Sequence, residues 1–163
     1  MFLVAAGIVT GVSYLLYQFY RRVTVTKEDV NNIDTLHLKL EAEIAKLKQE
    51  KRYKLIDRTI DDYCQQIFDI VNENRDKYTI DLHGLFTKQA LSFLKDRITQ
   101  LKKENYSGTL LVITGQGLHS ASGGAKIKPM IEEYLTTNNY SFVIGSKGGA
   151  YTVSLDKKKI NIK

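Results

Sequence analysis

The sequence is poor in cysteine and in proline. Its 163 residues include one cysteine, Cys64, and one proline, Pro129. A single cysteine excludes an internal disulfide framework and a cysteine-rich zinc site, and it fits a reducing compartment. With so little proline and no serine- or glutamine-rich tract, long disordered segments are not expected. Cys64 itself lies in a helix-like stretch, where we expect it to be a small buried apolar residue.

The length and the charge set the next limits. A chain of 163 residues allows one compact domain with extensions, because domains typically contain about 100–150 residues. Lysine and arginine number 24 against 18 acidic residues, so the formal net charge is +6. This balance favours an anionic partner, either nucleic acid or a lipid surface.

Residues 2–20 carry no charged side chain and are close to the roughly 20 residues that cross a bilayer. Arg21 and Arg22 follow at once, and the positive-inside rule then places the rest of the chain in the cytoplasm. A cleavable signal peptide would instead carry its charges before the apolar run and a small-residue site after it. The sequence therefore predicts a single-pass membrane anchor over residues 2–20 and a short linker over residues 21–26, with the identity of the membrane left open.

Residues 27–77 have the pattern of a helical extension. Apolar residues recur at steps of three and four, the period of one helix face, in two segments: Ile33, Leu36, Leu40, Ile44 and Leu47, and then, after Tyr53, Ile56, Ile60, Tyr63, Ile67 and Ile70. This predicts two amphipathic helices, or one helix interrupted near Lys51. A coiled coil is an alternative, and a homodimer could form through this segment or through the membrane helix, where Gly7 and Gly11 make a GxxxG spacing. His37 is expected to face solvent.

Residues 78–156 have the pattern of an α/β domain. Short apolar strands are predicted at residues 79–82, 109–114, 139–145 and 150–155, the last two joined by a hairpin. Helices are predicted at residues 89–105, with Thr87 as a cap, and at residues 127–135, with Pro129 in the first turn. The order β-α-β-α-β-β predicts a two-layer sandwich, which the basic tail of residues 157–163 follows.

The topology of this domain predicts where a site would lie. A right-handed crossover makes the first two strands parallel, so both end at the same edge of the sheet, where ligands usually bind. Asp81 and His83 stand at the end of the first strand and share one face of it, because side chains alternate along a strand. The glycine-rich loop of residues 115–124 follows the second strand and is expected to meet them.

The loop GQGLHSASGG (115–124) lacks the GxxxxGK[ST] and GxGxxG patterns, so nucleotide hydrolysis is not indicated. Its glycines allow backbone N–H groups to approach a phosphate, and it leads into a helix N-terminus, where anions are favoured. Lys126 and Lys128 would add positive charge. The alternative is a plain connection between a strand and a helix.

The motif IDLHGL, followed some 30 residues later by TGQGLHS and then by AKIKP, resembles the Smr (small MutS-related) domain, over residues 79 to about 155. Residues 61–76 also resemble the end of a helical extension that precedes Smr domains. The resemblance implies a two-layer α/β sandwich like the C-terminal domain of a bacterial translation initiation factor. It also implies nucleic-acid binding and, as in several members, endonuclease activity.

Residue by residue, the resemblance implies that Asp81 and His83 take part in cleavage. It places further residues at the nucleic-acid interface, and with the lysines discussed above the predicted contacts are Gly84, Gly115, Gln116, Gly117, His119, Ser120, Lys126 and Lys128. Many nuclease members carry arginine or lysine where this sequence has Gln116, and a neutral amide cannot contact a phosphate with charge assistance. Binding is therefore a firmer expectation than catalysis.

The resulting hypothesis is a membrane-anchored endonuclease that cleaves RNA, rather than DNA, without a metal ion. His83 would act as a general base, since an imidazole titrates near neutral pH, and Asp81 would orient it. One aspartate with one or two histidines falls short of the carboxylate clusters that hold Mg²⁺, so no metal and no other cofactor is expected. The alternatives are a non-catalytic module that binds RNA or ribosomes at a membrane, and a membrane-tethered dimeric adaptor that works through its helices.

Overall fold

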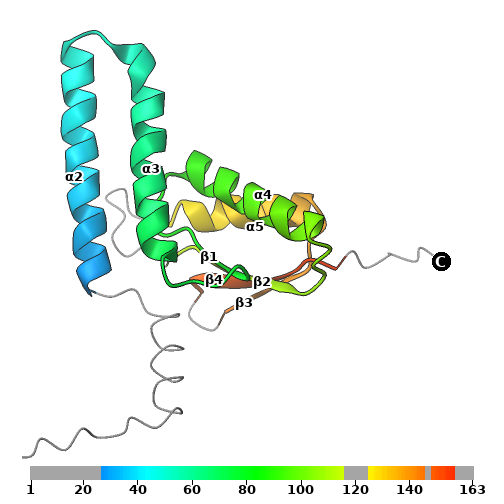
Figure 1. Ribbon diagram of the computed structural model, residues 1–163. Coiled ribbons are helices and arrows are strands. Elements are labelled where there is room, and N and C mark those ends of the chain that lie inside the picture. Colours follow the sequence, from blue (N-terminus) through cyan, green and yellow to red (C-terminus); the bar gives the residue numbers. More distant parts are fainter. Residues whose placement is uncertain (1–26, 116–124, 146–147, 157–163) are drawn as a thin grey trace, which may run out of the picture.

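The computed structural model describes residues 27–115, 125–145 and 148–156. Within them a pair of helices precedes a β-α-β-α-β-β domain, in the predicted order (Figure 1). The elements are α2 (Lys27–Gln49), η1 (Tyr53–Leu55), α3 (Ile56–Asn72), β1 (Thr79–Asp81), α4 (Thr87–Lys103), β2 (Thr109–Ile113), α5 (Ile127–Thr137), β3 (Phe142–Ile144) and β4 (Ala150–Ser154). The mixed α/β fold is thus confirmed.

The four strands form one sheet in the order β1-β2-β4-β3. β1 and β2 are parallel, as the crossover through α4 predicts, and β4 runs antiparallel to both β2 and β3. Helices α4 and α5 lie together over one face of the sheet, which makes the two layers of the domain (Figure 1). Within the described residues β1 is an edge strand that pairs with β2, and it also contacts α3.

The core lies between the sheet and its two helices. Alternate residues of β2 and β4 are buried, as expected for a strand with one covered face: Leu110, Val112, Tyr151 and Val153. Helices α4 and α5 contribute Leu94, Ile98, Leu101, Ile131 and Leu135, each at most 2% exposed. The Tyr151 hydroxyl donates to Glu132 Oε2 of α5 at 3.1 Å. Burial, together with this carboxylate, raises the pKa of Tyr151 to about 12.

Helices α2 and α3 pack against each other as an antiparallel hairpin (Figure 1). The chain turns between them at Lys51, which has a φ of 57°, so of the two alternatives the structure shows two separate helices. The apolar face of α2 is buried at seven-residue intervals, at Ile33, Leu40 and Leu47. This face packs on the helix of the same chain, and dimer formation through the segment stays a prediction.

The helical hairpin is docked on the α/β domain. Ile33 of α2 and Ile67 of α3 belong to the same hydrophobic cluster as Ile80 and Leu82, which flank Asp81. Cys64 is fully buried in this contact, as predicted, and burial raises the pKa of its thiol. The extension and the domain therefore share one core.

Two further predictions concern segment ends. Thr87 is the first residue of α4 and not its cap, because the helix begins two residues before the predicted start at residue 89; the capping position is Phe86, without a side-chain hydrogen bond. The predicted anchor (2–20), the linker (21–26) and the basic tail (157–163) lie outside the described residues. Within the described ranges, no helix combines the length and the apolar character that a membrane span requires.

Candidate active site

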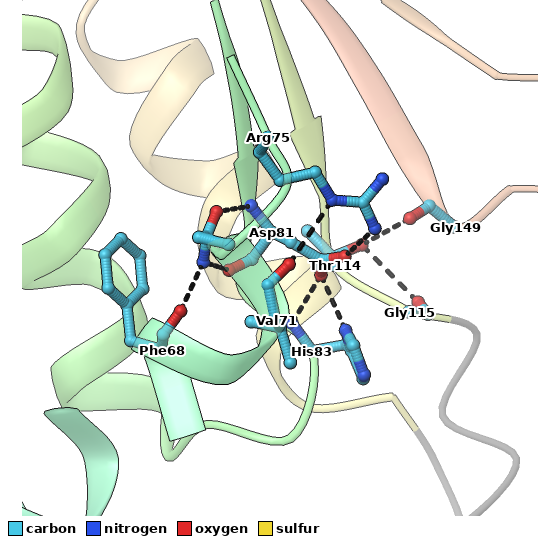
Figure 2. A network of polar contacts seen from close by, with 9 residues as sticks. Phe68, Val71, Arg75, Asp81, His83, Thr114, Gly115 and Gly149 are labelled. Carbon is cyan, nitrogen blue, oxygen red and sulfur yellow. Dashed lines mark hydrogen bonds and ion pairs between the residues drawn. The ribbon is translucent and has the colours of Figure 1, made fainter. Parts of the chain in front are cut away.

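Asp81 and His83 are in direct contact at the end of β1. Asp81 is fully buried, and its Oδ1 lies 2.6 Å from Nδ1 of His83 and 3.1 Å from the backbone nitrogen of His83 (Figure 2). A carboxylate can only accept hydrogen bonds, so Nδ1 carries the proton of the neutral ring and Nε2 carries none. The contact therefore fixes one tautomer of His83.

Arg75 forms an ion pair with the other oxygen of the Asp81 carboxylate. It lies in the turn between α3 and β1, its side chain is 6% exposed, and its Nη2 donates to Asp81 Oδ2 at 2.7 Å (Figure 2). Its Nε also donates to the carbonyl oxygen of Val71 at 3.3 Å. With both oxygens engaged and no exposed surface, Asp81 cannot itself contact a ligand, so any chemical role of Asp81 acts through His83.

Asn72, the last residue of α3, holds the backbone of Asp81. Its side-chain oxygen accepts the Asp81 N–H at 2.8 Å, and its side-chain nitrogen donates to the Asp81 carbonyl oxygen, also at 2.8 Å. The same nitrogen donates to the carbonyl oxygen of Phe68 at 2.8 Å. One amide thus connects the end of the helix to both polar groups of a single strand residue.

The turn after His83 packs against α2. Gly84 has a φ of 77°, and a Cβ added there would lie 3.0 Å from Cγ2 of Ile33, so a side chain would be both strained and crowded. The Gly84 carbonyl oxygen lies 2.8 Å from Nε2 of His37, and the rings of His37 and Phe86 meet edge to face at 5.9 Å. The expectation that His37 faces solvent is therefore wrong, because the docking of α2 brings this histidine onto the turn.

The end of β2 reaches the same place. The Thr114 N–H donates to the Gly149 carbonyl oxygen at 2.9 Å, and the Thr114 hydroxyl lies within 3.3 Å of that oxygen (Figure 2). Gly115 has a φ of 73°, and a Cβ on it would lie 3.2 Å from the Cβ of His83. The chain can pass this close to His83 because residue 115 is a glycine.

The remaining predicted contacts are only partly described. Lys126 is exposed just before α5, and Lys128 is half-buried with its Nζ 3.4 Å from where a Cβ on Gly148 would lie. Gln116, Gly117, His119 and Ser120 lie outside the described residues, so their roles stay predictions. Among residues 27–115, 125–145 and 148–156, no cluster of three or more histidine, cysteine or acidic side chains could hold a metal ion.

The chemistry that this arrangement offers centres on one nitrogen. Within the described part of the chain, two side-chain nitrogens of this site are buried and have no hydrogen-bond partner, Nε2 of His83 and Nη1 of Arg75. A neutral imidazole with Nδ1–H on a carboxylate and a bare Nε2 is arranged to accept a proton at Nε2, as in enzymes where an aspartate orients a basic histidine.

Four contributors to this site were not predicted: Asn72, Arg75, Thr114 and His37. Asn72 and Arg75 lie in the stretch of residues 61–76, whose resemblance to a helical extension was the available signal. Nothing in the residue pattern of that stretch marked its polar side chains as buried partners of Asp81.

Comparison with known proteins agrees with this description. The sequence profile of the Smr domain matches residues 80–150. Endonuclease NBR9 of Saccharomyces cerevisiae is 41% identical over 81 residues, which are 47% of this chain and 33% of the yeast protein. NEDD4-binding protein 2 of Homo sapiens is 37% identical over 83 residues, which are 47% of this chain and 5% of the human protein. The chain thus spans about a third of the first relative and about a twentieth of the second.

Solved structures include similar domains. The solution structure of the B3BP Smr domain is 35% identical, and the match covers 59% of this chain and 95% of that domain, with a TM-score of 0.47. The crystal structure of the human small-MutS related domain is 36% identical, covering 47% of this chain and 98% of that domain, with a TM-score of 0.40. Because the Smr profile matches residues 80–150 and the relatives are identical to this chain at more than a third of the aligned positions, residues 80–150 of this chain are an Smr domain.

Proposed function

We propose that this chain is an endonuclease that cleaves RNA without a metal ion, with His83 as the general base. The observation that carries the proposal is the 2.6 Å contact between Asp81 and Nδ1 of His83, which leaves Nε2 without a proton; this nitrogen is buried and has no hydrogen-bond partner in the described residues. The similarity to a yeast protein named as an endonuclease supports the same class of activity.

In the proposed reaction, Nε2 of His83 takes the proton of a ribose 2′-hydroxyl. The 2′-oxygen then bonds to the adjacent phosphorus, and the bond from phosphorus to the 5′-oxygen breaks. The leaving oxygen takes a proton from the imidazolium or from water, so the products are a 2′,3′-cyclic phosphate and a 5′-hydroxyl. Asp81 keeps the ring oriented and stabilises its charged form. Lys126 and Lys128 would offset the charge that develops on the phosphate oxygens.

This mechanism selects RNA, because DNA lacks the hydroxyl that loses the proton. The test is incubation of the full-length chain with a single-stranded RNA, and with a DNA of the same sequence, in excess EDTA. We expect cleavage of the RNA alone, and fragments with cyclic phosphate and 5′-hydroxyl ends. Loss of activity on chelation, or fragments with 5′-phosphate ends, would rule out the metal-free route.

The variants His83→Ala and Asp81→Asn assign the roles. His83→Ala should abolish cleavage, and Asp81→Asn should reduce it strongly because a neutral amide lacks the charge that stabilises the protonated ring. Lys39→Ala, on the exposed side of α2, is the control and should cleave like the wild type. Salt-sensitive RNA binding without any product would instead favour a non-catalytic RNA-binding module, in line with the neutral Gln116.

A second part of the proposal concerns location. The uncharged run of residues 2–20 and the arginines after it support a single-pass anchor with the Smr domain on the cytoplasmic side. The full-length chain should stay with membranes after alkaline extraction, and deletion of residues 2–20 should release it. Protection of the domain from protease added to the cytoplasmic face would contradict this orientation.

A further inference from the structure

The buried carboxylate of Asp81 is shared between two side chains that come from different parts of the chain. His83 belongs to the Smr domain, whereas Arg75 lies before residue 80, where the match to that domain begins. The two contacts use different oxygens, at 2.7 Å to Arg75 and 2.6 Å to His83. A residue outside the matched range therefore contacts the same carboxylate as His83.

The two contacts differ in how they can balance the charge of Asp81. A carboxylate without exposed surface is stable as an ion only when a cation and hydrogen bonds compensate it. The guanidinium of Arg75 is charged at every accessible pH, so it compensates Asp81 while His83 stays neutral. His83 then needs only to donate Nδ1–H, and its Nε2 remains bare.

Without Arg75 the site would have to balance the same charge differently. If His83 supplied the positive charge, both ring nitrogens would carry protons. If Asp81 took up a proton on Oδ1 instead, it would donate to Nδ1, and the ring proton would move to Nε2. In both of these states Nε2 carries a proton and can no longer accept one, whereas a proton on Oδ2, the oxygen that Arg75 contacts, would leave Nε2 bare and would contradict the role of Arg75.

The contacts of Arg75 aim its guanidinium at the carboxylate of Asp81. In the described residues, Nη1 of Arg75 is buried and has no hydrogen-bond partner, although Nε is held by the Val71 carbonyl oxygen and Nη2 by Asp81. The guanidinium is thus held on Asp81 by Nη2 and on the end of α3 by Nε.

We propose that Arg75 is a positioning residue for His83: its charge keeps Asp81 ionised, so that Asp81 holds His83 in the tautomer with a bare Nε2. The consequence for cleavage rests on the proposed function, whereas the effect on the tautomer does not. The turn after α3 would then be part of the machinery of the Smr domain and not merely a linker to it.

The protonation of the two ring nitrogens of His83 can be measured directly. The full-length chain is labelled with ¹⁵N-histidine, and the protonation of both His83 nitrogens is read from their NMR shifts at a fixed neutral pH. A His83→Gln variant identifies the signal among the three histidines. We expect the wild-type ring to be protonated at Nδ1 and bare at Nε2. In Arg75→Gln the bare Nε2 should be lost in most molecules, and Arg75→Lys, which keeps the charge, should restore most of it.

Arg97→Gln is the matched control. Arg97 is also a partly buried arginine beside β1, but it donates to the carbonyl oxygens of Lys77 and Thr79, each at 3.1 Å, and not to Asp81. Its substitution should leave the His83 tautomer unchanged. A wild-type ring without a bare Nε2, or an Arg75→Gln ring that matches the control, would overturn the proposal.

Folding is followed by circular dichroism for every variant. If Arg75→Gln does not fold, Arg75→Lys decides, and a folded Arg75→Lys chain that has lost the bare Nε2 contradicts the role of the charge. If neither variant folds while Arg97→Gln does, Arg75 is a determinant of stability and the positioning role is wrong.

RNA cleavage is measured in parallel and should fall at least tenfold in Arg75→Gln and recover in Arg75→Lys. A wild-type chain that does not cleave RNA, but whose tautomer responds to Arg75, would remove the proposed function and leave this inference standing. Cleavage that depends on His83, with a tautomer indifferent to Arg75, would do the reverse.

Discussion

Nε2 of His37 lies 2.8 Å from the carbonyl oxygen of Gly84, across 47 residues of sequence. A carbonyl can only accept, so His37 donates, and the bond ties helix α2 to the turn that follows His83. The helical hairpin thus contacts the candidate active site at both of its helices: α2 at Gly84 and the end of α3 at Asp81.

Substitution of His37 should therefore affect the site without being part of its chemistry. His37→Ala loses one partly buried hydrogen bond, which typically contributes about 0.5–1.5 kcal/mol to stability. We expect a loss in this range in urea unfolding and a partial loss of RNA cleavage, smaller than that of His83→Ala. Lys39→Ala, two residues away and exposed, should change neither. A His37→Ala chain as inactive as His83→Ala would give His37 a direct role.

Asn72 gives a prediction with a close internal control. Asn72→Ala removes both hydrogen bonds to the backbone of Asp81, and a buried polar group left unpaired costs about 1–3 kcal/mol. Asn138, at the end of α5, makes the same kind of bond to the carbonyl four residues earlier but no bond to a strand in the described residues. In urea unfolding Asn138→Ala should stay within about 0.5 kcal/mol of the wild type. Equal effects of the two substitutions would show that the bonds from Asn72 to the backbone of Asp81 contribute little to stability.

Gly115→Ala should impair the site more than the fold. The φ of 73° costs an L-residue roughly 1–2 kcal/mol, and the new Cβ would lie 3.2 Å from the Cβ of His83. The imidazole should shift, so cleavage should fall by an order of magnitude or more while the chain stays folded. Gly145→Ala is the control, since its Cβ would have its nearest neighbour at 3.5 Å. Normal cleavage by Gly115→Ala would show that the close approach to His83 is not needed.

Asp81→Ala should be among the most destabilising substitutions in the chain. It leaves the guanidinium of Arg75 buried without its counter-ion, and breaking a buried pair in this way costs about 3–5 kcal/mol. Asp62→Ala is the comparison, because Asp62 and Arg58 form an exposed pair at 4.0 Å, which should contribute less than about 1 kcal/mol. Chemical denaturation of both variants measures the difference. A loss as small as that of Asp62→Ala would mean that water reaches Arg75 readily.

The sequence was sufficient to predict the architecture of the domain. Period-two and period-3.6 patterns predicted the order of strands and helices, and the handedness of the crossover predicted the parallel pair that brings Asp81, His83 and Gly115 to one edge. These features follow from local pattern and general topology. Their prediction required no knowledge of individual contacts.

The residues that support Asp81 and His83 could not be predicted from such patterns. Arg75 and Asn72 stand among charged and polar residues after an amphipathic helix, where exposure to solvent is the usual outcome. Their burial depends on how the helical hairpin docks, which is a matter of tertiary packing. The same holds for His37, whose exposure was predicted from its charged surroundings on α2 and whose bond to Gly84 arises only when α2 lies against the turn.

The outer edge of β1 has a consequence beyond the site. An edge strand exposes backbone donors and acceptors on which another chain can pair. Here the Thr79 N–H donates to the carbonyl oxygen of Asp76, and the Thr79 carbonyl oxygen accepts from Nη1 of Arg97. The backbone N–H and carbonyl oxygen of Asp81 are both bonded to the side chain of Asn72. At Thr79 and Asp81 the outer edge of β1 therefore has no free backbone donor or acceptor with which another strand could pair. Asn72, which holds Asp81 at the candidate active site, thus also helps to keep the strand of a second molecule from pairing at this edge of the sheet.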